Sequence, residues 1–442
     1  MKRTAFLLIV SAVAAFSSLG RAQTPPTATS AVARSQTDRQ PQAVKVTEYT
    51  LPPEKLAKAE ALYRTSTVLY LAGMIFSIAV LWIILRLRIA PAFRDLSERV
   101  SRNRFLQTLI FVPLIMALVA VTCLPLEIYE HHISLAYGLS VQGWSSWAGD
   151  WLKGEALFLV VTVLAALALF WVIGKSPRRW WFYFWLLTLP LIVLLVFIAP
   201  VVLEPMFNTF VPLDKAEPGL VRAIEEVAHR GGLNIPADRM FEMKASQKVT
   251  TYNAYVTGIG ATKRVVVWDN TARDMSTPEV LFVFGHEMGH YVLNHIYKGL
   301  EFFAGLSFVG FWLERKIVIF TLAQWGKDWR IRSMNDLAAL PVFLLGLTLL
   351  TVVSEPIGSA FSRHLEHQAD IYGLEVTHGL FPDNQQVAAS AFQKLGEKSY
   401  DYPTPNRFLV FWSYDHPTIQ QRICFALHYD AWHTGAAPKY VK

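Results

Sequence analysis

Long runs of apolar residues dominate the middle of the chain. Four of them are long enough to cross a lipid bilayer as helices. They cover residues 67–87, 105–126, 156–173 and 181–202. A fifth run begins near Phe302 but contains Glu314-Arg315-Lys316, and a sixth covers residues 337–353. Charges inside an apolar run indicate either an early end of the span or a face turned towards a water-filled cavity. The pattern predicts a mainly α, polytopic transmembrane helical bundle of about six to seven helices.

Between the fourth and fifth runs the pattern changes to that of a globular α+β segment. Apolar residues recur at helical spacing from Leu220 to Ala228, and Gly231 is expected to end that helix. A short strand is expected near residues 239–243. Two β-prone runs, 250–257 and 264–269, are separated by a glycine-containing turn, which predicts a hairpin.

The rest of the chain can be divided by composition. Residues 1–22 combine a basic start, an apolar core and small residues at the end, as in a signal peptide or an uncleaved signal anchor. Residues 23–47 are rich in Thr, Ala, Pro, Gln and Ser, and we expect a disordered linker. The remaining parts are a first transmembrane region, the globular part, two further spans and a polar helical C-terminal part. They cover residues 48–203, 204–300, 301–356 and 357–442.

The composition agrees with a membrane protein. The 442 residues are 53% hydrophobic and only 17% charged, which is too apolar for an ordinary soluble enzyme. The net charge of +7 does not indicate nucleic-acid binding, because the basic residues lie between apolar runs and not along a stripe with interleaved aromatic residues. Cys123 and Cys424 are the two cysteines, so we expect neither a disulfide framework nor a cysteine metal site.

The segment His286-Glu287-Met288-Gly289-His290 carries the strongest chemical signal. Two histidines four residues apart lie on one face of a helix, so both imidazoles can bind one metal ion. The glutamate between them can take a proton from a metal-bound water. A helix-start signal at Ser276-Thr277-Pro278-Glu279 favours a helix here. Gly285 and Gly289 would let another backbone come close. A helix whose histidines merely face solvent or a partner helix is the alternative.

A zinc site of this type needs a third protein ligand. The best candidate is Glu366, because Arg363, Glu366 and Asp370 project from one helical face. Asp370 can accept the spare N–H of a ligand histidine, and Arg363 can steady the group. His364 and His367 are rival ligands, but each is turned well away from Glu366 around the helix. A polar helix with salt bridges is the alternative without a metal.

The residues after His290 argue against a metzincin site. That pattern needs Gly three positions and His six positions after the second histidine, where this chain has Leu293 and Ile296. His295 is one position away from the required register, and we expect it to lie on the surface.

Together these features resemble the membrane-embedded zinc metalloproteases typified by the type 1 CAAX prenyl protease, which belong to the gluzincin class. The resemblance covers roughly residues 45–430 and includes motifs well away from the histidines. These motifs are Ala199-Pro200, Phe207-Asn208-x-Phe210-x-Pro212-Leu213, Asn253-Ala254-Tyr255, Arg264-Val265-Val266-Val267, Arg363-x-x-Glu366-x-x-Ala369-Asp370, and Ser413-Tyr414-Asp415-His416-Pro417 with Arg422.

The resemblance implies a fold and a set of catalytic roles. The helical bundle would carry an α+β gluzincin-type zinc metalloprotease domain, and the chain would be a zinc metalloendopeptidase. His286, His290 and Glu366 would bind one Zn²⁺ per chain. Glu287 would be the general base and later the proton donor, and His416 would stabilise the oxyanion.

The resemblance also implies how a substrate binds. An edge strand with Asn253, Ala254 and Tyr255 would hold a peptide or membrane-protein segment extended, by β-strand addition. The family's founding substrates carry a prenylated CAAX motif, but no feature of this sequence selects a prenyl group over another apolar segment. A quality-control protease of the same family without prenyl specificity is therefore the alternative. A polytopic transporter or scaffold is a different class, and the candidate ligands lie outside the spans, not at the membrane midplane.

The basic residues predict an orientation for this multi-pass protein of the cell membrane. The loops after the first and third runs and the loop before the sixth run are basic, whereas residues 127–150 contain no Lys or Arg. Basic loops are usually cytoplasmic. The zinc domain would then face outward, which is the side that we favour. The eukaryotic members, whose site opens to the cytosol, imply the opposite side.

Overall fold

The computed structural model describes residues 45–258, 263–433, 435 and 437–441. The expected signal segment and most of the expected linker lie outside the described residues. Of that linker, residues 45–47 are described, and Val46 is buried. Val46, Tyr49 and Leu51 pack in the main core of the globular part. The chain therefore contacts the globular part before it enters the first membrane helix.

Among the described residues, five helical segments are long and apolar enough to cross a membrane. The helices in these segments are α2 Pro53–Arg86, α4 Arg104–Ala136, α5 Trp144–Lys175, α6 Trp180–Ile198 and α13 Leu340–Thr377. Helix α6 continues through the π-helix η2, Ala199–Leu203, into α7, Glu204–Phe207. The predicted mainly α polytopic bundle is confirmed. The helices are longer than the apolar runs because only their central part must match the hydrocarbon of a bilayer.

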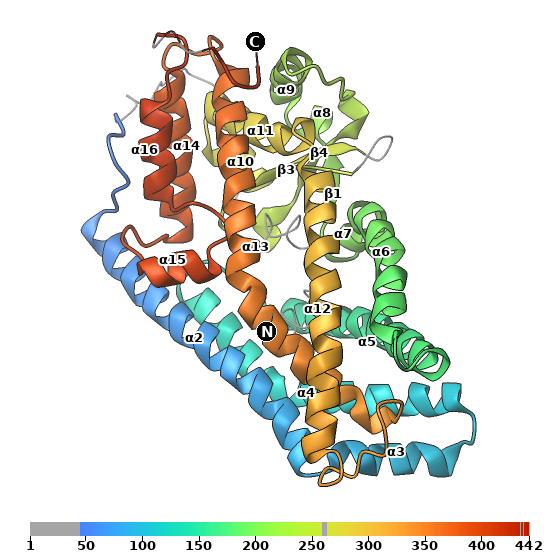
Figure 1. Cartoon of the computed structure of the whole chain (residues 1–442). Coiled ribbons are helices and arrows are strands. Elements are labelled where there is room, and N and C mark those ends of the chain that lie inside the picture. Colours follow the sequence, from blue (N-terminus) through green and yellow to red (C-terminus); the bar gives the residue numbers. More distant parts are fainter. Residues whose placement is uncertain (1–44, 259–262, 434, 436, 442) are drawn as a thin grey trace.

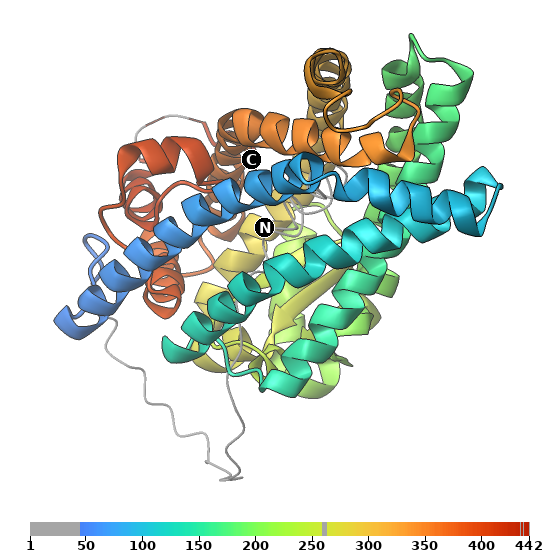
Figure 2. The same cartoon turned by 90° about the horizontal axis from the view of Figure 1, so that it is seen from below.

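Helix α12, His295–Trp325, runs through the charges that interrupt the fifth apolar run. Glu314 is only 3% exposed, and Arg315 Nε donates to the carbonyl of Arg178 over 3.1 Å. An early end of this helix is thus excluded, because its backbone hydrogen bonds continue whatever the polarity of the side chains. Figure 2 shows α12 end-on while α2, α4 and α13 run across the view, so α12 is inclined to these three helices.

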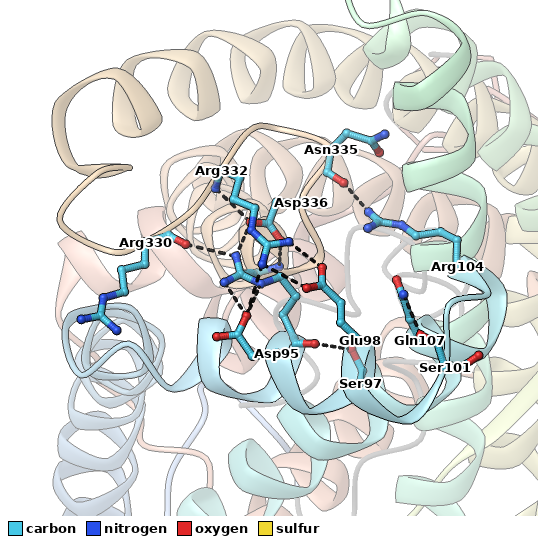
Figure 3. Close-up of polar contacts among 12 residues, drawn as sticks. Asp95, Ser97, Glu98, Ser101, Arg104, Gln107, Arg330, Arg332, Asn335 and Asp336 are labelled. Carbon is cyan, nitrogen blue, oxygen red and sulfur yellow. Dashed lines mark hydrogen bonds and ion pairs between the residues drawn. The ribbon is translucent and has the colours of Figure 1, made fainter.

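A polar cluster fastens α3, Ile89–Val100, to the loop between α12 and α13 (Figure 3). Arg94 and Asp336 form an ion pair at 2.5 Å, and their side chains are only 5% and 3% exposed. Arg94 also donates to the carbonyl of Arg330 over 3.1 Å. Asp336 caps the 3₁₀-helix η6, Leu337–Ala339, which leads into α13. The start of α13 is therefore tied to the amphipathic helix between the first two spans.

The globular part contains a four-stranded mixed sheet. Its strands are β1 Phe210–Pro212, β2 Met240–Met243, β3 Ala254–Thr257 and β4 Arg264–Trp268. The order is β1-β2-β4-β3, in which β2 and β4 are parallel and the other two pairs are antiparallel. The predicted hairpin is present as β3 and β4, and β2 is the strand expected near residue 240. Strand β3 lies at one edge of the sheet.

Short helices connect the sheet to the rest of the globular part. They are α8 Leu213–Ala216, α9 Pro218–Arg230, η3 Ala237–Arg239, η4 Ala245–Gln247 and α10 Asp269–Asp274. Helix α9 ends at Gly231 as predicted, and Gly232 has a φ of +75°. Glycine adopts this left-handed conformation without a steric cost, which allows the chain to turn away after the helix.

Four further helices complete the globular part and surround the candidate chemistry. They are α11 Thr277–Val292, α14 Asn384–Ser399, α15 Arg407–Ser413 and α16 Ile419–His428. Helices α11, α14, α16 and the end of α13 share one core with one face of the sheet. In Figure 1 this core lies in the upper half, α3 lies at the lower end, and α12 and α13 run between them. The long helix α13 thus belongs to both parts, and it crosses the boundary predicted at residue 356 without a break.

Candidate active site

The metal motif lies on α11, whose backbone packs very closely against the end of α13. A Cβ atom added at Gly373 would lie 3.0 Å from the backbone nitrogen of His286. One added at Gly289 would lie 3.2 Å from the Cα atom of Ala369. Glycine permits this close approach, because a Cβ atom at either position would make a tighter contact than well-packed interiors usually contain. This contact places Glu366 of α13 opposite the two histidines of α11.

His286, His290 and Glu366 present one ligand atom each within 4.8 Å of one another. His286 Nε2 lies 3.3 Å from Glu366 Oε2, and His290 Nε2 lies 3.4 Å from Glu366 Oε1. The two imidazole Nε2 atoms are 3.2 Å apart. Two imidazole nitrogens and a carboxylate oxygen form one of the ligand sets of catalytic zinc sites.

The surroundings of these atoms fit a bound cation. The side chains of His286 and Glu366 are about 5% exposed, and Glu366 Oε2 accepts no hydrogen bond among the described residues. A buried carboxylate oxygen without a hydrogen bond is costly unless a cation or another donor neutralises it. The three side chains therefore suit Zn²⁺, and they form the candidate metal site.

Asp370 and Arg422 hold His286 from the side away from the candidate ligands. Asp370 Oδ1 lies 2.8 Å from His286 Nδ1. Arg422 donates from Nη2 to Oδ1 over 2.6 Å and from Nε to Oδ2 over 3.0 Å. Burial acts to lower the pKa of His286, but the carboxylates of Asp370 and Glu366 raise it to about 9. A metal ion that binds here displaces this proton, because a ligand histidine is neutral.

Two side chains beside the candidate ligands can move protons or donate to a substrate. Glu287 is 4% exposed, and burial raises the pKa of its carboxyl group above the usual 4.5. His416 Nε2 lies 3.2 Å from Glu366 Oε2, while its Nδ1 lies 2.9 Å from Asp415 Oδ1. Burial opposes protonation of His416, but Glu366 and Asp415 raise its pKa to about 9. His416 thus directs Nε2 into the site and is oriented by the carboxylate of Asp415.

Arg363 does not contact the candidate ligands. Its guanidinium donates to the carbonyls of Val410 and Tyr414, and it therefore holds the segment between α15 and His416. The helical spacing predicted that Arg363 would steady the group, whereas the guanidinium that binds Asp370 is that of Arg422. No local signal links Arg422 to Asp370, because the two residues are 52 positions apart. Only the motif that contains Pro417 and Arg422 points to it.

His295 is buried, which contradicts the expectation of a surface residue. Its relative exposure is 0%, and its Nδ1 lies 3.0 Å from Nδ1 of His290. The prediction assumed that the helix continues past His290. The chain instead bends at Asn294, and this bend turns His295 back towards His290. The rival ligands His364 and His367 are both exposed, and the ring of His367 packs on Phe425.

Ala254 and Tyr255 begin β3, Asn253 directly precedes it, and α11 packs against this strand. Thr271 Oγ1 accepts from Asn253 N and donates to Asn253 O. Ala254 is 1% exposed in the core, and the hydroxyl of Tyr255 donates to Glu204 over 2.9 Å. The side chains of Ala254 and Tyr255 are thus engaged within the protein. The outer edge of β3 has no partner strand among the residues that the structure describes.

A metal-binding triad with a neighbouring glutamate, set against a polytopic helical bundle, defines a membrane metallopeptidase. Residues 214–429 match the profile of Peptidase family M48. Residues 31–209 match the profile described as "CAAX prenyl protease N-terminal, five membrane helices". The chain belongs to peptidase family M48, and it combines this peptidase with the N-terminal membrane domain of the CAAX prenyl proteases. It is a multi-pass integral membrane protein.

Individual relatives agree with this assignment. The chain is 35% identical over 387 residues to a Bacillus subtilis protein named "Uncharacterized metalloprotease YhfN", which covers 87% of this chain and 89% of that protein. CAAX prenyl protease 1 of Saccharomyces cerevisiae is 28% identical over 341 residues, covering 72% of this chain and 71% of the yeast protein. The crystal structure of S. mikatae Ste24p superimposes with a TM-score of 0.74 at 22% identity, covering 96% and 98% of the two chains. The last comparison shows a shared fold.

Proposed function

We propose that this protein is an integral-membrane zinc endopeptidase that hydrolyses peptide bonds close to the bilayer. The observation that carries the proposal is the convergence of His286, His290 and Glu366 with a buried Glu287 beside them. His416 directs its Nε2 at the same group. It supplies the hydrogen-bond donor that amide hydrolysis needs for the developing oxyanion.

Each residue has a separate task in the proposed reaction. When bound by the three ligands, zinc would polarise the substrate carbonyl and lower the pKa of a water molecule towards 7. Glu287 takes the proton of the attacking water and later delivers it to the leaving amine. His416 donates from Nε2 to the oxygen that gains negative charge, and Asp415 keeps the imidazole in place through Nδ1. Asp370 and Arg422 hold His286 in a fixed orientation.

We further propose that the substrate binds as an additional strand along β3. Main-chain hydrogen bonds would hold the peptide, because the side chains of Ala254 and Tyr255 are already packed or hydrogen-bonded. Main-chain recognition does not depend on a prenyl group. We therefore expect hydrolysis of matched peptides with and without a C-terminal prenyl group, measured by mass spectrometry in lipid nanodiscs. Cleavage of the prenylated peptide alone would contradict this part of the proposal.

We propose that the site opens on the outer side of the membrane. Arg88 donates to the carbonyl of Asp328, Arg104 to that of Asn335, and Arg315 to that of Arg178. The first two contacts join the loop after α2 to the loop before α13, and the third joins the loop after α5 to α12. These loops lie at the end of the bundle away from the globular part (Figure 1). Basic loops favour the cytoplasm. An alkaline-phosphatase fusion should be active at Asp214 and inactive at Asp328, and the reverse pattern would place the site inside.

The central experiment compares the wild type with Glu287→Gln. Both full-length proteins should contain one zinc per chain by elemental analysis, while the variant should lose about 10²–10⁴-fold in peptide hydrolysis. Glu226→Gln, at an exposed position of α9, is the matched control and should keep full activity. Full activity in Glu287→Gln would refute its role as base, and a wild-type protein without zinc would refute the metal site. Comparing peptides released in cells that express each form would identify substrates.

A further inference from the structure

We propose that His295 is a positioning residue for His290, and that Gln368 fixes the imidazole tautomer through which His295 acts. This inference rests on the proposed zinc site and extends it to the residues that hold the second histidine. His295 is fully buried, and no role in the proposed reaction accounts for a buried imidazole at this position.

A continuous row of polar contacts leads from the candidate metal site to the surface of α13. His290 Nδ1 lies 3.0 Å from His295 Nδ1, and His295 Nε2 lies 3.1 Å from Gln368 Oε1. Gln368 Nε2 in turn lies 2.8 Å from Nε2 of the exposed His364. The row contains one residue of α11, one of α12 and two of α13.

A single left-handed residue brings His295 into this row. On an uninterrupted helix, a residue five positions after His290 would be rotated by about 140° around the axis. Helix α11 instead ends at Val292, and Asn294 has a φ of +58° before α12 begins at His295. Asparagine tolerates this conformation better than most residues that have a side chain. The bend turns the first side chain of α12 back onto the last ligand of α11.

The contacts determine the direction in which each hydrogen bond is donated. His290 directs Nε2 at the candidate metal site, so its proton lies on Nδ1 when Nε2 is a ligand. His295 Nδ1 must then accept, which places the proton of His295 on Nε2. Gln368 Oε1 accepts that proton, and Gln368 Nε2 donates to His364. The Gln368 amide has the orientation that these hydrogen bonds require, with Oε1 facing His295 and Nε2 facing His364.

The two ligand histidines are therefore held in different ways. His286 contacts the carboxylate of Asp370, whereas His290 contacts a neutral imidazole. A neutral acceptor fixes the ring and its tautomer without adding negative charge to the metal site. Losing such a partner typically weakens metal binding by about 10–100-fold.

The test measures zinc dissociation constants of the full-length protein by competition with a chelator. His295→Leu removes the acceptor and should weaken zinc binding by about 10–100-fold. In His295→Asn, Oδ1 can take the place of Nδ1, so this variant should recover most of the affinity that His295→Leu loses. His367→Leu, next to Gln368 and packed on Phe425, is the control and should bind zinc like the wild type.

Two results would overturn this inference while the zinc site stands. The first is an equal loss of zinc affinity in His295→Asn and His295→Leu, which would indicate that His295 acts by packing alone. The second is a zinc affinity of His295→Leu that equals that of the wild type. If thermal unfolding shows that His295→Leu is not folded, Gln368→Leu at its partly exposed position replaces it and should also weaken binding. A wild-type protein that binds no zinc would instead overturn the proposed function.

Discussion

Arg422 shows, at the scale of single residues, how a distant side chain completes the metal site. Its guanidinium makes two hydrogen bonds to Asp370, and both side chains are largely buried. The ring of Phe392 lies under the guanidinium at 4.2 Å. Asp370 is thus neutralised by Arg422 and remains available to His286.

Replacing Arg422 by Met should destabilise the protein by about 3–5 kcal/mol, because the carboxylate of Asp370 would stay buried without its partner. Zinc affinity should fall as well, since His286 would lose a fixed acceptor. Thermal unfolding and chelator competition measure the two effects. The control is Arg273→Met. The side chain of Arg273 is 60% exposed and pairs with Asp274, so this substitution should destabilise the protein by less than about 1 kcal/mol. Equal effects of the two variants would contradict the prediction.

Single residues were also where sequence patterns and structure differed most. The spacing on α13 pointed correctly to the face that carries Glu366 and Asp370, because helical periodicity is a local property. The same spacing placed Arg363 in the group, whereas its guanidinium turns to the carbonyls before His416. Periodicity predicts on which face of a helix a side chain lies. It does not predict which residue from a distant segment contacts that side chain.

At the scale of elements, the site depends on the contact between α11 and α13. Helix α11 starts with a capping box formed by Ser276 and Glu279. Glu279 is also bound by Ser390 over 2.6 Å and by Lys394 over 2.7 Å, which ties the start of α11 to α14. Burial acts to raise the pKa of Glu279, but these donors and Ser276 outweigh it and lower the pKa below the usual 4.5.

The cap predicts a pH-dependent effect of Glu279→Gln. A carboxyl group with a depressed pKa stabilises the folded state above pH 4.5, its unfolded value, and loses this contribution as pH falls through the folded value. The variant should therefore have a lower Tm than the wild type at pH 7. The difference should shrink as the pH falls below 4.5. A difference in Tm that is the same at pH 4 and pH 7 would show that ionised Glu279 does not hold the cap.

Gly373→Ala tests the close approach of the two helices. Its new methyl group would meet the backbone of His286 at 3.0–3.2 Å, and such overpacking costs about 1–3 kcal/mol. Zinc affinity should fall although no ligand is changed, because α11 and α13 must separate. Gly358→Ala lies on the same helix with no atom within 4 Å of the added Cβ. This control should leave zinc affinity unchanged and stabilise the helix slightly.

At the scale of the whole molecule, the ends of α13 connect two distant polar clusters. Its start follows the ion pair of Arg94 and Asp336 (Figure 3), and its far end carries Glu366 and Asp370. Helix α2 packs against α13, and Val46, Tyr49 and Leu51 lie in the same core as the far end of α13. One continuous helix, α13, therefore runs from this ion pair to the candidate metal site.

Arg94→Met should lower the stability of the folded protein by about 3–5 kcal/mol, because Asp336 would be left buried without its cation. Zinc affinity of the protein that remains folded should not change, since this cluster lies at the opposite end from the site (Figure 1). Arg332→Ala is the control, because its side chain is 58% exposed and pairs with Glu98 at the surface. A loss of zinc affinity without a loss of stability in Arg94→Met would contradict this separation.

The sequence by itself determined the features that depend on neighbouring residues. Hydropathy predicted the membrane helices, glycine ended α9, the turn between two β-prone runs predicted the hairpin, and spacing placed His286 and His290 on one face. These signals are local because hydrogen bonding in helices, turn conformations and burial in lipid act on short segments. The tertiary structure alone decided the pairings between segments. It pairs Arg422 with Asp370, and it brings His295 into contact with His290 through the bend at Asn294. It also shows that α12 continues through its charged residues. Such contacts depend on how whole elements pack, which hydropathy and periodicity along one segment do not encode.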